Sequence, residues 1–368
     1  MVYCSFLASP FKALLISHEN IVYTSIVDVM DGVLKVILVL LLPYFSFDKL
    51  LAYGSIMLGI QLFNLMSYMI YCYVKYEECI LPKSRLFSYS YIKELSGFTS
   101  WMLYSSVCIT IRTQGLSVVL NKIYGTAINA AYGIGCQLSG MVSFVSSSFN
   151  NAIAPQLMAA EGGGDRRKML SLAEIQSKTS FLLLAMIGIP TMFEMRTLLE
   201  IWLVDVPEHT TLFACVFLAM QIVDMLSVGL GAANQAIGNV RRYTLVTFTP
   251  KLLILPLSWY ILKYTDSLIL VGVIMFLCET ICMFLRIFLF RNESWFNARG
   301  YCISVILRSV APVIASTIIC FALRLFMDSE LRIILTYLCS VPMFIVISYI
   351  ITLTKSEKRA VKAILRKK

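Results

Sequence analysis

The chain has 368 residues, of which 59% are hydrophobic and 14% charged, with a formal net charge of +10. Its mean hydropathy is +0.80, whereas soluble domains carry about 25% charged residues. These values exclude a soluble globular protein and indicate an integral membrane protein. Tryptophans and tyrosines stand where many apolar runs end, which is typical of helical membrane proteins.

The apolar runs define the expected spans, because a helix needs about 20 residues to cross a bilayer. Short polar links separate these runs, and only the stretch at 76–93 is long enough to join two helical bundles. The sequence therefore predicts an all-α, polytopic protein of about eleven spans, at residues 1–17, 21–44, 49–74, 94–121, 125–155, 172–203, 209–236, 242–263, 267–290, 302–326 and 331–354.

Basic residues gather on alternate links, and lysine and arginine are retained on the cytoplasmic side of membrane proteins. This pattern predicts a cytoplasmic C-terminus, with a basic tail at 355–368 that lies against membrane lipids. An odd number of spans then places Met1 outside, although residues 1–17 lack the features of a signal peptide. We therefore expect an N-terminally truncated transporter. The links assigned to the cytoplasm carry Lys75, Lys83, Arg85, Lys93, Arg166, Arg167, Lys168, Arg241, Arg242, Arg286, Arg291 and Arg299.

Two segments, at 9–45 and 230–262, follow the same order of features. Each ends one helix, turns through a polar link to Tyr-Thr, and carries a lone lysine in the next helix, Lys35 or Lys251. Many secondary transporters are built from such repeats, with the substrate site at the interface between the halves. The repeat favours a transporter.

Three stretches carry a resemblance to a known family. They are "FNNAIAPQLMAAEGGGDRRKMLSLAEIQSKTSFLLL" (149–184), "LLEIWLVDVPEHTTLF" (198–213) and "AANQAIGNVRRYTLVTFTPKLLILPLSWY" (232–260), and "PFKALLISHENIVY" (10–23) adds to them. In order and spacing the chain resembles the polysaccharide and O-antigen flippases of the multidrug/oligosaccharidyl-lipid/polysaccharide exporter superfamily.

The resemblance implies a MATE-like fold of two six-helix bundles, here without about three initial helices. Residues 1–75 would be the remainder of the first bundle, 76–93 a cytoplasmic link, 94–291 the second bundle, and 302–354 two additional helices. The implied function is to flip a polyprenyl-pyrophosphate-linked oligosaccharide to the outer leaflet of the bacterial inner membrane for surface polysaccharide biosynthesis. Implied partners are this substrate, membrane lipids and polysaccharide assembly proteins such as a polymerase, and no nucleic acid.

Cations inside the spans are candidates for contacting the pyrophosphate, because ionisable residues within a membrane usually mark a functional site. Each also has a structural alternative. Lys35 could pair with Asp31 one helical turn before it, and Lys251 could satisfy carbonyls freed by Pro250. Lys178 could extend toward the membrane surface. The candidates are Arg112, Lys251, Lys35 and Lys178, with Gln114 close to Arg112.

Neutral polar residues form a second group of candidates, in the runs 125–155 and 209–236. Asparagine, glutamine and serine side chains can hydrogen-bond between helices or face a sugar, and glycines allow close helix contact. Asp224 stands out as a lone carboxylate. The candidates are Gln137, Asn150, Asn151, Asp224 and Gln235, and the glycines beside them are Gly133, Gly135 and Gly140.

Enzyme signatures are missing from the sequence. Both histidines lie in links and the eleven cysteines form no CxxC, so we expect no metal, no cofactor and no catalytic residue. "EGGGDRRK" lacks the ending of a phosphate-binding loop. Two alternatives to the flippase stay open: a drug or cation antiporter of the same fold, which would need interior acids, and a polysaccharide polymerase or ligase, which would need a long outer loop.

Overall fold

The computed structural model describes residues 2–18, 20–42, 49–79, 89–265, 267–291, 295–326, 331–354 and 357–359, and these ranges contain helices and no β-strand. The chain divides into two compact units, Met1–Ser90 and Tyr91–Lys368. Their boundary falls within the predicted link at 76–93, of which residues 80–88 lie outside the described residues, as do 355–356 and 360–368 of the predicted tail.

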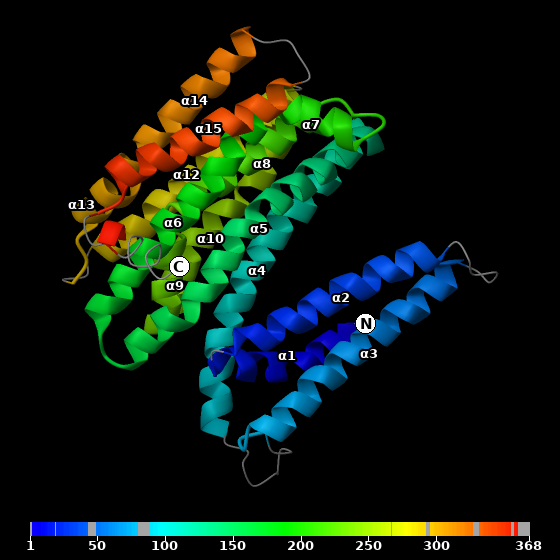
Figure 1. The fold of residues 1–368 in the computed structure, drawn as a ribbon, viewed down its shortest axis with the longest axis vertical. Helices are drawn as coiled ribbons and strands as arrows, with labels where there is room; N and C mark the ends of the chain where they lie inside the picture. Colours follow the sequence, from blue (N-terminus) through cyan, green and yellow to red (C-terminus); the bar gives the residue numbers. More distant parts are fainter. Residues whose placement is uncertain are drawn as a thin grey trace. The chain divides into compact units, whose positions relative to one another are not determined.

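Within its described residues, unit 1 holds three packed helices, drawn in blue in Figure 1: α1 (Val2–Ser17), α2 (Ile21–Leu41) and α3 (Lys49–Lys75). Both α1 and α2 pack against α3. Leu15, Val27, Tyr68 and Cys72 form the buried centre. The unit is small, so most of its apolar side chains point outward.

Unit 2 holds the remaining helices. It starts with the long pair α4 (Tyr89–Tyr124) and α5 (Thr126–Gly162), and it ends with α14 and α15, which pair with each other and pack on α6. The helices between and after them are α6 (Arg166–Phe193), α7 (Met195–Trp202), α8 (Thr210–Met225), α9 (Val228–Ile237), α10 (Val240–Leu252), α11 (Ile254–Tyr264), α12 (Leu268–Arg291), α13 (Ala298–Tyr301), η3 (Cys302–Leu307), α14 (Arg308–Phe326), α15 (Arg332–Ile347) and η4 (Ser348–Thr352).

Seven helical segments in the described residues are long and apolar enough to cross a membrane, and an eighth is formed if the bent pair α8 and α9 is one span. The sequence predicted eleven spans. Helices cover the other three runs as well, but α1 is short, α2 carries three charged residues, and α5 is rich in serine and asparagine. The protein is thus a multi-pass helical membrane protein.

Several helices break at polar or proline positions. The chain bends by 50° between α8 and α9, where Ser227 stands at the break. The span at 240–264 is interrupted at Leu253, three residues after Pro250 removes a backbone donor. These breaks bring polar backbone and side-chain groups into the interior of unit 2.

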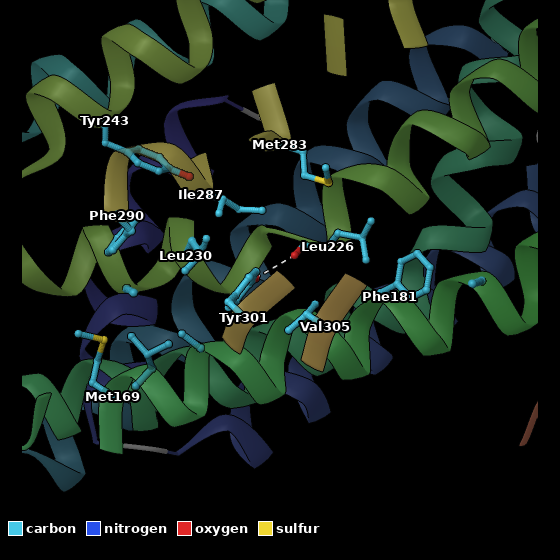
Figure 2. Packing of buried hydrophobic residues seen from close by; sticks show 14 of the residues in the cluster. Met169, Phe181, Leu226, Leu230, Tyr243, Met283, Ile287, Phe290, Tyr301 and Val305 are labelled. Atoms are coloured by element: carbon cyan, nitrogen blue, oxygen red, sulfur yellow. Dashed lines mark hydrogen bonds between the residues drawn. The ribbon is translucent and has the colours of Figure 1, made fainter. Parts of the chain in front are cut away.

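The core cluster with the most buried apolar residues draws on α5, α6, α9, α10, α12, the end of α13, η3, α14 and α15 (Figure 2). Tyr301 is fully enclosed in this core, and its hydroxyl donates to the carbonyl of Leu226 at 2.8 Å. That hydrogen bond satisfies a carbonyl at the bend after α8, and a second, to Ser177 at 2.8 Å, ties α13 to α6. The core therefore fixes the bend.

A buried acid holds α15 to α6. Glu194 stands between α6 and α7, and Arg332 at the start of α15 binds its carboxylate with Nε and Nη2, each at 3.0 Å. The hydroxyl of Thr336 donates to the same carboxylate at 3.2 Å. A two-point guanidinium–carboxylate contact is geometrically specific, so it fixes how these helices dock.

Close helix contacts explain only some of the glycines. A Cβ on Gly135 would lie 2.8 Å from the backbone nitrogen of Ala214, so α5 and α8 touch there. At Gly229 a Cβ would lie 1.9 Å from the carbonyl oxygen of Ala173. Gly133 and Gly140 have nothing within 4 Å. The packing interpretation is correct for Gly135 and wrong for the other two.

Candidate functional site

A polar pocket of ≈ 260 Å³ lies inside unit 2, lined by residues of α4, α5, α6, α8, α9, α10 and α12. Five amide side chains line it, together with the ionised pair Asp224 and Arg286 and the aromatic rings of Tyr243 and Phe248. Amides, a guanidinium and aromatic rings can all bind a sugar or another polar solute. The five amides are Asn150, Asn151, Gln176, Asn234 and Gln235.

Arg286 and Asp224 form an ion pair at the wall of this pocket, with 2.7 Å between Nη1 and Oδ1. The same guanidinium donates to Ser227 Oγ at 3.1 Å. Ser227 stands at the break between α8 and α9, so the bend presents both its hydroxyl and the nearby Asp224 to Arg286. The bend and the ion pair are parts of one arrangement.

A second group of charges lies deeper and centres on Glu279 of α12. Its Oε1 accepts from Lys251 Nζ at 2.5 Å and its Oε2 from Arg112 Nη1 at 2.7 Å. The side chains of Glu279 and Lys251 are 3% and 5% exposed, and that of Arg112 is 13% exposed. Ions removed from water need such pairing to be tolerated. Glu279 is therefore the reason that an arginine and a lysine can stand inside apolar helices.

The two groups of charges are neighbours. Glu279 and Arg286 are separated by two turns of α12 and lie on one face of it, and Asp224 interacts electrostatically with Lys251 and Glu279. Three cations and two carboxylates thus share the interior of unit 2. The network has an excess of one positive charge, which favours an anionic ligand over a cationic one.

Buried polar atoms around the pocket lack partners. Gln176 Oε1, Asn234 Nδ2 and Arg286 Nε have no hydrogen-bond partner within the described ranges. An unsatisfied buried donor or acceptor costs about 1–3 kcal/mol, so such groups are normally met by water or by a ligand. The pocket is suited to a hydrated or hydroxyl-rich ligand.

Asn150 both hydrogen-bonds between helices and lines the pocket, the two alternatives that its sequence position allowed. Its Oδ1 accepts from Gln176 Nε2 at 3.3 Å and from Ser180 Oγ at 2.5 Å, which joins α5 to α6. It also lines the pocket.

The other amide candidates divide between the pocket and the exposed surface. Asn151, one residue after Asn150, is exposed and lines the same pocket. Gln235 lines it as well, whereas Gln114 and Gln137 are exposed and do not.

Lys178 is buried and pairs with an acid that follows the last long helix. Its side chain is 1% exposed, and its ammonium contacts Glu357 at 2.9 Å, in the segment that follows α15. Burial alone would raise the pKa of Glu357, but the Thr354 backbone N–H and the Lys178 ammonium outweigh it and lower the pKa of this carboxyl. The ammonium thus meets an acid of the predicted cytoplasmic tail, and the snorkelling alternative stays a prediction.

Lys35 belongs to unit 1 and makes the local pair that its spacing allows. Its ammonium lies 2.5 Å from Asp31 Oδ2, and Asn64 of α3 donates to the other oxygen of Asp31 at 2.7 Å. A further pair in unit 1 joins Lys12 to Asp28 at 3.2 Å. Lys12, Asp28, Asp31 and Asn64 line a separate cleft of ≈ 470 Å³ within unit 1, whereas Lys35 does not line it.

The sequence did not predict that Arg286 and Glu279 belong to the buried charge network. Arg286 was counted among the cytoplasmic basic residues, but it is buried beside Asp224. Glu279 is not among the candidates from the sequence, and no acid stands near Arg112 in the chain. Lys251 pairs with this carboxylate and not with carbonyls freed by Pro250. The available signal was the spacing of Glu279 and Arg286, seven residues apart in an otherwise apolar helix.

Comparisons with protein-family models, curated proteins and solved structures find no match to this chain. Within the described residues there is also no group of three or more histidine, cysteine or acidic side chains that could hold a metal ion.

Proposed function

We propose that this chain is a bacterial inner-membrane transporter that binds and flips a polyprenyl-pyrophosphate-linked oligosaccharide for surface polysaccharide biosynthesis. The observation that carries the proposal is the pocket of unit 2, where five amides face an ionised Arg286. Sugar hydroxyls pair well with amides, and the excess positive charge of the network favours a pyrophosphate. The motifs that resemble polysaccharide flippases support the same assignment.

We also propose how the transporter is built. It comprises a MATE-like arrangement of two bundles with about eleven spans, a cytoplasmic C-terminus, and transport without a catalytic step. The interior charges support it, since apolar side chains of similar size would often be as stable in their place as a buried ion pair. A network held despite that cost has a purpose in binding or in conformational change.

A drug or cation antiporter of the same fold is less well supported. Such a transporter needs a free interior carboxylate for its cationic substrate. In unit 2 the two acids of the network are already neutralised, Glu279 by Lys251 and Arg112, and Asp224 by Arg286. A cation entering the pocket would meet the neutral pair of Asp224 and Arg286, with the excess positive charge of the neighbouring network close by.

Binding tests the proposal without requiring a complete transport cycle. The purified chain in detergent is titrated with a short-chain polyprenyl pyrophosphate that carries an oligosaccharide, and with the same carrier without sugar. We expect the glycan to increase affinity, and Asn151→Ala to remove most of that increase, because Asn151 lines the pocket. Removing one or two sugar hydrogen bonds should weaken binding about tenfold.

The matched control is Gln137→Ala, which removes an exposed amide from the same helix outside the pocket. It should leave the affinity for the glycan unchanged. Equal affinities of the chain for the carrier with and without sugar would overturn the proposal, and so would equal losses in the two variants.

A further inference from the structure

A second pocket, of ≈ 560 Å³, lies at the start of α6 in unit 2, and residues 295–297 also line it. Arg166, Arg167, Trp295 and Phe296 are among its lining residues. It shares none of its lining residues with the amide pocket. Both α6 and α12 are candidate spans, so their ends, and this pocket, lie at the boundary between lipid and water.

The pocket contains a guanidinium that is available to a ligand. Arg166 is engaged, because its Nε lies 3.1 Å from Glu161 Oε1 and its guanidinium lies 5.2 Å from the ring centroid of Trp295. Glu174 accepts a hydrogen bond from Ser304. Arg167 makes no hydrogen bond or ion pair with any residue that the structure describes. Arg167 is therefore the free cation of the pocket.

Local helix energetics do not account for the basic residues here. Arg166, Arg167 and Lys168 occupy the first turn of α6, where Asp165 caps the backbone and Glu161 pairs with Arg166, which leaves Arg167 and Lys168 without a carboxylate partner among the described residues. Cations are unfavourable at a helix N-terminus, because the helix dipole is positive there. The charged residues that line the pocket are these two arginines and Glu174. A cluster of cations that the helix itself disfavours is suited to an anion.

The aromatic residues give the pocket its second component. Trp295 and Phe296 lie beside the guanidinium groups, and tryptophan is typical of the headgroup level of membranes. Arginine binds a phosphate with two parallel hydrogen bonds, whereas an aromatic ring packs on glycerol and the first methylenes of a lipid. The combination matches an amphiphile with an anionic head better than it matches a free ion.

We propose that this pocket binds the phosphate of an anionic phospholipid headgroup, with Arg167 as the phosphate ligand and Trp295 and Phe296 against the glycerol region. The site is separate from the proposed glycan pocket, and it would tie this end of unit 2 to an anionic membrane surface. Free phosphate has the same charge chemistry without the apolar part, so the experiment separates the two sources.

The test measures the thermal unfolding midpoint of the full chain in mixed micelles. The probes are phosphatidylglycerol, phosphatidylcholine and inorganic phosphate, each titrated separately. We expect phosphatidylglycerol to raise the midpoint and phosphatidylcholine to have no such effect. Arg167→Gln should require about tenfold more phosphatidylglycerol for the same shift, because it removes a charged hydrogen bond.

Lys168→Gln is the matched control, since it removes the same charge one residue away from a side chain that does not line the pocket. It should titrate like the unchanged chain. Arg167→Lys keeps the charge but loses the two-point contact, and should be intermediate. Equal weakening by Arg167→Gln and Lys168→Gln would overturn the proposal by showing diffuse attraction. The same holds if phosphatidylcholine or inorganic phosphate reproduces the full shift, or if phosphatidylglycerol has no effect.

Discussion

The ion pairs of unit 1 and unit 2 differ in reach and in burial. In unit 1, Lys35 pairs with Asp31 four residues before it, and the two side chains are 39% and 19% exposed. In unit 2, Glu279 joins Lys251 to Arg112, which lies 167 residues earlier in the chain, and all three are nearly buried. Water screens the first pair, whereas the second depends on its partners for all of its solvation. The consequences of breaking them should differ accordingly.

The largest effect is expected for Glu279→Gln. The substitution keeps the shape of the side chain but leaves two buried cations without an anion, and breaking a buried pair in this way costs about 3–5 kcal/mol. The thermal unfolding midpoint in detergent should fall sharply. Lys251→Met in the same chain should recover part of the loss, because it removes one of the unpaired cations.

The matched control is Glu200→Gln, which breaks the exposed pair with Arg196 in α7. It should change the free energy of unfolding by no more than about 0.5 kcal/mol. If the Glu279 and Glu200 variants unfold at the same temperature, then the buried network does not stabilise unit 2 in the way described.

Glycine substitution extends the comparison from charge to packing. At Gly229, α9 approaches α6 so closely that a Cβ would lie 1.9 Å from a backbone oxygen, while Gly59 in α3 of unit 1 has nothing within 4 Å. Gly229→Ala should destabilise the protein by about 1–3 kcal/mol. Gly59→Ala should stabilise it by up to about 1 kcal/mol, because alanine is the better helix former. The midpoints should move in opposite directions, and a shift in the same direction would contradict the packing.

The pair of Lys178 and Glu357 has intermediate exposure and gives a pH-dependent effect. The pKa of Glu357 is lowered in the folded protein, so its contribution to stability is fully present above the unfolded value of about 4.3 and is lost as the pH falls through the folded value. Glu357→Gln should reduce the free energy of unfolding at neutral pH. The difference from the unchanged chain should shrink below pH 4.3, and a difference that grows on acidification would contradict the pairing.

The smallest effect is expected for Lys35→Ala. The pair with Asp31 is half exposed and local, and such helix pairs contribute about 0.3–0.5 kcal/mol. Asn64 still donates to Asp31 in the variant. High salt should remove the difference between the variant and the unchanged chain. A loss of several kcal/mol would show that Lys35 is as dependent on its partner as Lys251.

The contrast between local and long-range ion pairs also explains which features the sequence could predict. Apolar runs and their lengths predicted the helices, because a span is a local property of about twenty residues. The pair of Lys35 and Asp31 followed from helical spacing. The partners of Lys251, Arg112 and Lys178 come from distant helices, and no spacing in the sequence relates them. The count of spans was less predictable, since polar residues in α5 and charges in α2 lower the apolarity of helices that the run lengths alone would accept.

The pocket was partly predictable for the same reason. Asn150, Asn151, Asp224 and Gln235 were candidates because polar residues in apolar helices are uncommon, and the structure brings these four to one cavity. Arg286 was not a candidate, because it lies five residues before the end of α12, a position typical of an arginine at the membrane surface. Only the bend between α8 and α9 turns Asp224 and Ser227 toward it.

The central claim is that the amide pocket of unit 2 binds a sugar, beside a charge network that carries one positive charge in excess. The most direct measurement is a pair of calorimetric titrations of the unchanged chain, one with a short-chain polyprenyl-pyrophosphate oligosaccharide and one with the lipophilic cation tetraphenylphosphonium. The account predicts saturable binding of the glycan, competed by the free oligosaccharide, and no saturable binding of the cation. Saturable binding of the cation with none of the glycan would contradict it and favour the antiporter.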